Sequence, residues 1–204
     1  MSKEAYEQKK RERLKKKEEK KRKAKQEKIK SNLTTYISIA LVLIVVVFGI
    51  YWLVDSSKPT GEDFSQKIEI MEESHIAPGS VLPEYNSNPP TSGPHYTQTA
   101  EAGYRTEEIE DQYIIHNLEH GDIWISYKPS VSSEVKEALK QFDHVKVIIT
   151  PREANDMDIA IAAWGRLDKF NLENDELPVQ RINDFIARYA NQGPEKIPGK
   201  SQGI

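Results

Sequence analysis

An uncharged apolar segment from Leu33 to Val54 limits how this chain of 204 residues can fold. Its residues are mostly Ile, Leu and Val, and a helix of that length spans roughly 33 Å, enough for the hydrocarbon core of a bilayer. Tyr36 lies near one end and Tyr51-Trp52 near the other, where aromatic side chains settle at the two membrane interfaces. The segment therefore predicts a transmembrane helix over residues 33–54.

A cleaved signal peptide would also begin with positive charge, but two observations argue against one. The apolar run is longer than the ~7–15 residues of a signal core. The sequence from Trp52 to Asp55 offers no small-residue cleavage pattern. A buried helix of a soluble fold would usually carry a polar stripe, which this segment lacks. We therefore expect an anchor that stays attached.

Charge divides sharply on the two sides of this segment. Residues 1–30 contain 15 Lys and Arg against 6 Asp and Glu, whereas residues 31–204 contain 14 against 26. The positive excess before the span predicts a cytoplasmic N-terminus and an extracytoplasmic C-terminal part, in the cell membrane. The basic tail, residues 1–32, should be solvated and contact the bilayer through anionic lipid head groups. It lacks the interleaved aromatic residues that would indicate nucleic acid as a partner.

The remainder of the chain predicts a linker, one domain and a tail. Residues 55–63 are polar and contain Pro and Gly, as expected of a linker. The extracytoplasmic domain should occupy residues 64–195, followed by a frayed tail at 196–204. The chain contains no cysteine, which excludes disulfides, thiolate metal sites and cysteine nucleophiles.

The domain begins with a long irregular segment and then becomes regular. Five prolines between Ala77 and Tyr96 exclude regular structure there and predict a stiff loop, of a length that is usually functional or disordered. Beyond it, residue periodicity predicts the order β-β-α-β-β-α. Strands are expected at 112–115, 122–127, 144–150 and 158–164, after a short one at 66–71, and helices at 130–142 and 177–190. This order favours an α+β fold with a mostly antiparallel sheet and both helices on one face, for which a ferredoxin-like arrangement is one option.

Histidines suggest the chemistry of the domain. His116 and His120 stand four residues apart, with Glu119 between them. Two such imidazoles lie roughly 6 Å apart on a helix but roughly 13 Å apart along a strand, so chelation of one ion requires a turn. Strand-forming neighbours and the flexible Gly121 favour a hairpin that folds His120 back toward His116.

Two further donors extend this pair. His95 ends the proline loop, whose rigid backbone can hold an imidazole in place. Met157 is a soft donor that suits copper. Each residue also has an interpretation without a metal: the histidines lie in a hairpin or on the surface and bind nothing, and the methionine only packs. The predicted ligands of one copper or zinc ion are His95, His116, His120, Glu119 and Met157.

Three motifs of this domain are shared with a known group of proteins. They are Asn-Pro-Pro-Thr-Ser-Gly-Pro-His-Tyr at 88–96, His-Asn-Leu-Glu-His-Gly at 116–121 and Ala-Trp-Gly-Arg at 163–166. From about Ile70 to Glu195 the chain resembles an uncharacterised family of bacterial, membrane-anchored proteins with a domain of unknown function. The resemblance implies a bacterial source and a shared fold, but it carries no activity.

Three classes of function stay open. The first is an extracytoplasmic domain that binds a transition-metal ion through histidines. The second is a non-catalytic interaction domain of the cell envelope without a metal. The third is a zinc-dependent hydrolase, because His-x-x-Glu-His is also the inverted zinc-peptidase motif. That motif requires a helix, whereas its surroundings here predict strands, so we prefer metal binding to catalysis.

The predicted topology can be tested by labelling single cysteines in a chain that has none of its own. We expect a membrane-impermeant thiol reagent to label Ser80→Cys on intact cells, because the positive excess precedes the span. Ser2→Cys should be labelled only after the membrane is permeabilised. Labelling at position 2 without labelling at position 80 would reverse the orientation.

Overall fold

The computed structural model describes residues 3–56, 58–201 and 203 and divides the chain into two units, residues 1–57 and 58–204. Residues 1–2 of the basic tail, residue 57 of the predicted linker, and residues 202 and 204 of the predicted C-terminal tail lie outside this description.

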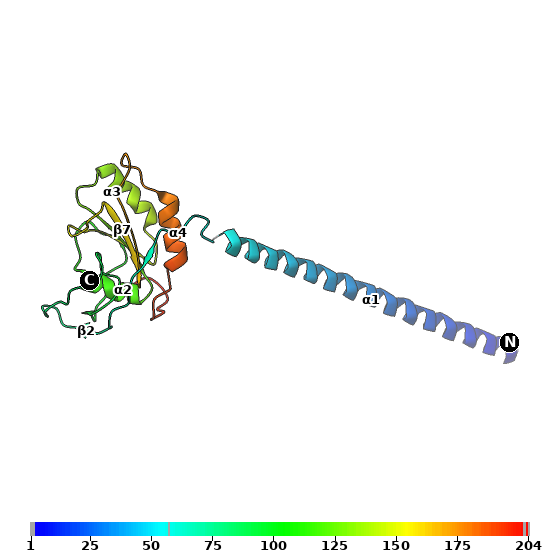
Figure 1. Cartoon of the computed structure of the whole chain (residues 1–204). Helices are drawn as coiled ribbons and strands as arrows, with labels where there is room; N and C mark the ends of the chain where they lie inside the picture. The colour runs from blue at the N-terminus through cyan, green and yellow to red at the C-terminus, as the bar shows by residue number, and fades with distance from the viewer. Residues whose placement is uncertain (1–2, 57, 202, 204) are drawn as a thin grey trace. The chain divides into compact units, whose positions relative to one another are not determined.

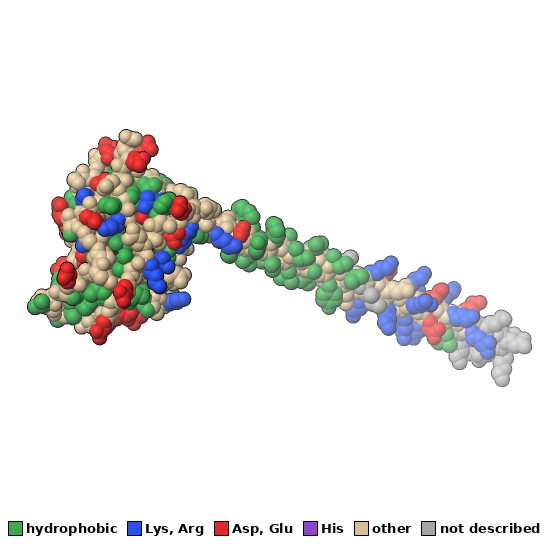
Figure 2. Space-filling view, viewed as in Figure 1, with side chains coloured by type: hydrophobic (Ala, Val, Ile, Leu, Met, Phe, Trp, Pro, Cys, Tyr) green, Lys and Arg blue, Asp and Glu red, His purple; other side chains and the backbone are tan. Residues whose placement is uncertain are grey.

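The first unit contains helix α1, Lys3–Ser56 (Figure 1). Among its described side chains, Lys and Arg are frequent before the apolar stretch, which makes up the C-terminal part of the helix (Figure 2). Within α1, the 22 residues Thr35–Ser56 have a mean hydropathy of 2.9 and are long and apolar enough to cross a membrane. This stretch lies within two residues of the predicted span at 33–54.

A six-stranded sheet forms the centre of the second unit, with the strand order β1-β8-β7-β5-β6-β4. The strands are β1 (Gln66–Lys67), β4 (Gly103–Tyr104), β5 (Ile123–Tyr127), β6 (Val147–Pro151), β7 (Ile159–Ala163) and β8 (Arg166–Phe170). Neighbours from β1 to β5 pair antiparallel, whereas β6 runs parallel to β5 and to β4. The sheet is thus mostly antiparallel and the fold is α+β, but the order of elements differs from the predicted β-β-α-β-β-α.

Helices cover both faces of this sheet. Alternate residues of β5 set the two sides, because Ile123 and Ile125 join one apolar core while Trp124 joins the other. Helices α3 (Ser133–Leu139) and α4 (Val179–Tyr189) lie on the first side, and the 3₁₀ turn η1 (Lys140–Phe142) continues α3. Helix α2 (Asp111–Glu119) lies on the second side. The helices predicted near 130–142 and 177–190 are confirmed and share a face, as expected. The layer formed by α2 was not predicted.

Helix α2 occupies the place where the sequence predicted a strand at 112–115 and a hairpin loop. Ile114 and Leu118, four residues apart, are fully buried against Trp124. A helix of nine residues is too short to be stable alone, so packing against the sheet outweighs the strand preference of its Tyr-Ile-Ile sequence. The strand and hairpin predicted here are therefore wrong.

A small parallel ladder of two strands lies outside the main sheet. Strand β2 (His75–Ile76) pairs with β3 (His95–Tyr96), and the register places His75 opposite His95. The proline loop connects the two strands, and its residues 89–93 are buried rather than on the surface. The loop is therefore part of the packed domain.

Arg152 is a buried cation that ties the proline loop to α2. Its guanidinium donates to the two carboxylate oxygens of Asp111 at 2.9 and 2.7 Å and to Asn88 Oδ1 at 2.6 Å. It also lies 5.6 Å from the centroid of the Trp124 ring. Because Asp111 begins α2 and Asn88 begins the proline-rich motif, one side chain fixes both segments that carry predicted ligands.

Parts of the predicted linker and tail also pack onto the domain. The carboxylate of Asp184 on α4 accepts hydrogen bonds from the backbone amides of Thr60 and Gly61 at 3.1 and 2.7 Å. At the other end, the Ser201 carbonyl accepts from the Ala102 amide at 3.3 Å. Residues 60–61 and Ser201 are thus held by specific hydrogen bonds.

Replacing Arg152 with Lys should destabilise the domain, because an ammonium cannot reproduce the two-pronged contact with Asp111. We expect the free energy of unfolding to fall by roughly 1.5–3 kcal/mol, because hydrogen bonds to a charged partner are lost while the charge itself is kept. Denaturant titration of the full chain in detergent measures it. Arg105→Lys is the matched control, since its half-exposed pair with Glu101 should contribute less than about 1 kcal/mol. Equal losses in both variants would contradict the special role of Arg152.

Candidate metal centre

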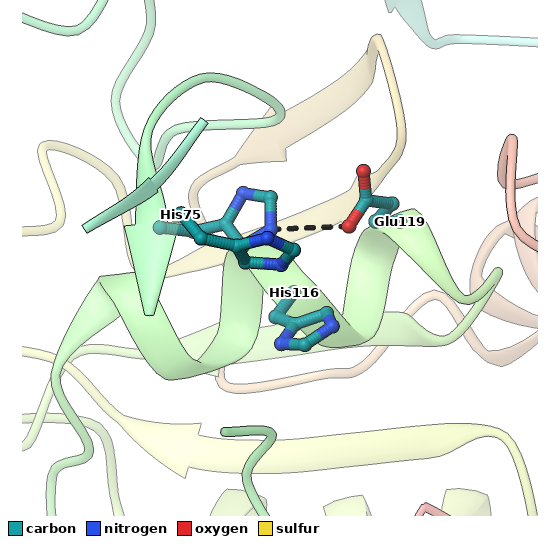
Figure 3. Close-up of side chains that lie close together, drawn as sticks. His75, His116 and Glu119 are labelled. Carbon is teal, nitrogen blue, oxygen red and sulfur yellow. Dashed lines mark ion pairs between the residues drawn. The ribbon is translucent and has the colours of Figure 1, made fainter. Parts of the chain in front are cut away.

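Four side chains from three segments converge beside α2. His75, His95, His116 and Glu119 each place one possible ligand atom within 4.8 Å of the others. The ring centroids of His75 and His95 are 4.8 Å apart, and both rings lie about 5 Å from that of His116, at 5.1 and 5.0 Å. Figure 3 shows His75, His116 and Glu119 facing one another. The donors therefore form one cluster.

Local structure explains the convergence. The parallel register of β2 and β3 sets His75 beside His95. On α2, His116 and Glu119 are three residues apart, a spacing that brings side chains to the same side of a helix. Helix α2 packs against β3, so the ladder and the helix present their polar side chains to each other.

One close approach within the cluster joins two atoms that can both accept hydrogen bonds. The Gly93 carbonyl lies 2.8 Å from His95 Nδ1, and a carbonyl can only accept, so Nδ1 carries the proton and Nε2 keeps a lone pair. That Nε2 lies 3.0 Å from Glu119 Oε2. Neither atom has a well-aligned hydrogen bond within the described part of the chain. Two acceptors at this distance repel unless a proton or a metal ion lies between them.

Burial dominates the electrostatics of this cluster. His95 is 1% exposed, and burial is the largest cause that lowers its pKa. Burial, followed by the neighbouring histidines, lowers the pKa of His116 to about 4. Burial also raises the pKa of Glu119 to about 7, with smaller contributions from the charges of Glu195 and Glu73. At neutral pH His95 and His116 are thus neutral and able to ligate, and Glu119 is close to the pH at which it loses its proton.

The other two predicted ligands lie elsewhere. His120 caps the C-terminus of α2, where its Nε2 lies 3.3 Å from Glu195 Oε2. It belongs to a second donor group, formed by His116, His120 and Glu195. Met157 lines a pocket with Phe64, Leu167 and Arg181, none of which belongs to either donor group.

Sequence reasoning missed His75 and Glu195. Neither stands in a spacing that indicates a ligand, since each reaches the site through chain pairing over a long sequence distance. His75 arrives by pairing with β3, and Glu195 by a hydrogen bond from its backbone amide to the Glu119 carbonyl at 3.0 Å. Of the two, only His75 had a sequence signal, because it is one of just five histidines in the chain.

The helical motif also changes the argument about hydrolysis. The sequence predicts strands around His-x-x-Glu-His, which speaks against a zinc-peptidase site. In the structure the motif lies in α2 and at its C-cap, so that reason no longer holds. In the inverted zinc-peptidase motif the two histidines bind zinc and the glutamate is the general base. Here Glu119 faces His95, and His120 faces Glu195. The three motif residues are thus divided between two donor groups.

Comparison with known proteins identifies a family without adding chemistry. The profile of a family described as a protein of unknown function, DUF3105, matches residues 78–202. This range includes all three motifs and the predicted ligands His95, His116, Glu119, His120 and Met157. No curated protein and no solved structure matches the chain.

Glu119→Gln should stabilise the metal-free chain at high pH. The folded state holds its proton up to about pH 7, whereas the ordinary pKa is 4.5. The wild type therefore loses stability as pH rises from about 4.5 through 7, and Gln does not. We expect an advantage of roughly 3 kcal/mol near pH 8 that disappears below about pH 4.5. Denaturant titration with a chelator present measures it.

The matched control is Glu176→Gln, an exposed glutamate before α4. Its pH profile, measured in the same way, gives the reference for the Glu119→Gln profile. Parallel pH profiles for the two variants would contradict a raised pKa at Glu119.

Proposed function

The chain belongs to the DUF3105 family, whose function is unknown, and we propose that it is a membrane-anchored, extracytoplasmic protein that binds one transition-metal ion, copper or zinc. The ligands are His75, His95, His116 and Glu119. The observation that carries the proposal is the buried pair of acceptors, His95 Nε2 and Glu119 Oε2, at 3.0 Å. A cation between them removes the repulsion and satisfies both.

The spacing of the donors supports a metal ion at this position. Ligand bonds of about 2.0–2.1 Å in a tetrahedral site place neighbouring donor atoms roughly 3.3 Å apart. The His95–Glu119 distance of 3.0 Å is close to that value, and the other donors lie within 4.8 Å. Small side-chain shifts complete the coordination, most easily at His75, which is exposed.

Charge around the cluster also favours a cation over a proton. Glu195 and Glu73 act on Glu119 as negative neighbours and raise its pKa. A divalent ion neutralises this excess of negative charge more completely than a single proton does. Because His95 and His116 are neutral at physiological pH, they offer their lone pairs without first losing a proton.

The donor set favours binding over hydrolysis and limits the choice of metal. Catalytic zinc sites use three protein ligands and keep the fourth position open, whereas four donors converge here. Imidazole suits copper and zinc, and the hydrogen bond from His95 Nδ1 to Gly93 fixes that ring in the ligating tautomer.

The membrane part of the proposal rests on α1. Its apolar stretch, Thr35–Ser56, is the anchor. The basic residues before it face the cytoplasm and contact anionic lipid head groups. The metal-binding domain then lies on the outer side, where it can take up extracytoplasmic metal ions.

Metal titration of the full chain in detergent tests the site. We expect one Cu²⁺ or Zn²⁺ per chain, and His95→Ala or His116→Ala should weaken affinity by at least about 100-fold, since each removes a buried direct ligand. At a free ion concentration of 100 times Kd, the wild type should gain about 2.7 kcal/mol of stability. Calorimetry and thermal unfolding measure the two quantities.

His144→Ala is the matched control, because His144 is exposed and lies outside both donor groups. Its affinity should equal that of the wild type. A wild type that binds neither ion, or identical isotherms for His95→Ala and His144→Ala, would leave the non-catalytic interaction domain as the better account.

A further inference from the structure

A second group of donors lies directly beside the proposed site and is more exposed than it. His116, His120 and Glu195 place one possible ligand atom each within 4.8 Å of one another. The side chain of His120 is 12% exposed and that of Glu195 is 56% exposed, whereas His95 and Glu119 are buried. The donors therefore run from the exposed Glu195 through His120 to the buried His95 and Glu119, with His116 in both groups; His75, the remaining donor of the first group, is exposed.

The segment that carries Glu195 is built closely onto the end of α2. The Asn191 amide donates to the Gly121 carbonyl at 2.8 Å, and the Glu195 amide donates to the Glu119 carbonyl at 3.0 Å. A Cβ atom on Gly193 would lie 2.1 Å from the Glu119 carbonyl oxygen, so only glycine allows this approach. The backbone thus holds the Glu195 carboxylate 3.3 Å from His120 Nε2.

The other side of His120 is fixed as well. The Lys146 ammonium donates to the His120 carbonyl at 3.2 Å and pairs with the buried Asp122 at 2.9 Å. The His120 ring packs against that of His116 with centroids 4.5 Å apart. The outer group is therefore positioned by the fold and does not depend on a flexible surface side chain alone.

We propose that His116, His120 and Glu195 form an outer metal position through which the ion passes into the buried position. This inference rests on the proposed function of the buried cluster. A neutral imidazole has one unprotonated nitrogen, so His116 ligates one ion at a time. An ion held outside can then move inward by exchanging His120 and Glu195 for His95 and Glu119 while His116 stays bound. The ion loses its water ligands in steps and is never released.

The kinetics of metal binding distinguish this role from a purely structural one. Glu195→Gln keeps the backbone contacts but weakens the outer position. In the full chain in detergent, Zn²⁺ association and dissociation should both slow by about tenfold or more, a larger factor than the rise in Kd that follows from losing the Glu195 charge. Stopped-flow mixing with a zinc indicator gives the rates, and chelator competition gives Kd. Glu176→Gln, an exposed glutamate away from the site, should leave both unchanged.

A second arm isolates the outer position. With His75→Ala and His95→Ala combined, the chain should still bind about one Zn²⁺ more weakly, and adding Glu195→Gln should abolish that binding.

Three outcomes would overturn the inference. A wild type that binds Zn²⁺ at the same rate as Glu195→Gln refutes the outer position but leaves the buried site standing. Two Zn²⁺ bound at once in the wild type refute the sharing of His116. Absence of binding in the wild type removes the proposed function itself, and this inference with it.

Discussion

The burial of α2 on two sides is the constraint on which the domain depends. One side packs Ile114 and Leu118 against the sheet, and the other carries His116 and Glu119 beneath the strands that flank the proline loop. A helix of this length has little stability of its own, so tertiary contacts define it. Arg152 holds both partners of the polar side in place, because it binds the first residue of α2 and the start of the proline-rich motif. The donor cluster is a consequence of this packing.

Burying so many polar groups has an energetic cost that shapes the chemistry. On the surface, water could hydrogen-bond to an imidazole or a carboxylate. Burial removes that water and shifts each pKa in the direction that favours the uncharged form of the group. In this cluster His116 and Glu119 shift in opposite directions for the same reason. The packing thus produces a site in which neutral nitrogen donors surround a carboxyl group that ionises near pH 7.

The sequence predicted most of the features that depend on local pattern. The apolar stretch of α1, the helices α3 and α4, and strand β5 follow from composition and periodicity over short windows. Three of the proposed ligands, His95, His116 and Glu119, stood in motifs that indicated them. Helix α2 could not be predicted, because its Tyr-Ile-Ile sequence favours a strand and only contact with Trp124 reverses that preference. His75 and Glu195 were missed since pairing between distant segments brings them to the site.

The chain has no cysteine, so an ion bound by the histidines would cross-link the chain where disulfides cannot. His75, His95 and His116 lie on three different segments, so an ion bound by all three closes two chain loops at once. Closing loops lowers the entropy of the unfolded chain in the way that disulfides do in secreted domains. Unlike a disulfide, a cross-link through imidazoles does not depend on the redox state of thiols. The domain would then keep this metal cross-link under reducing and oxidising conditions alike. It would lose the cross-link only when acid protonates the ligands or a stronger chelator removes the ion.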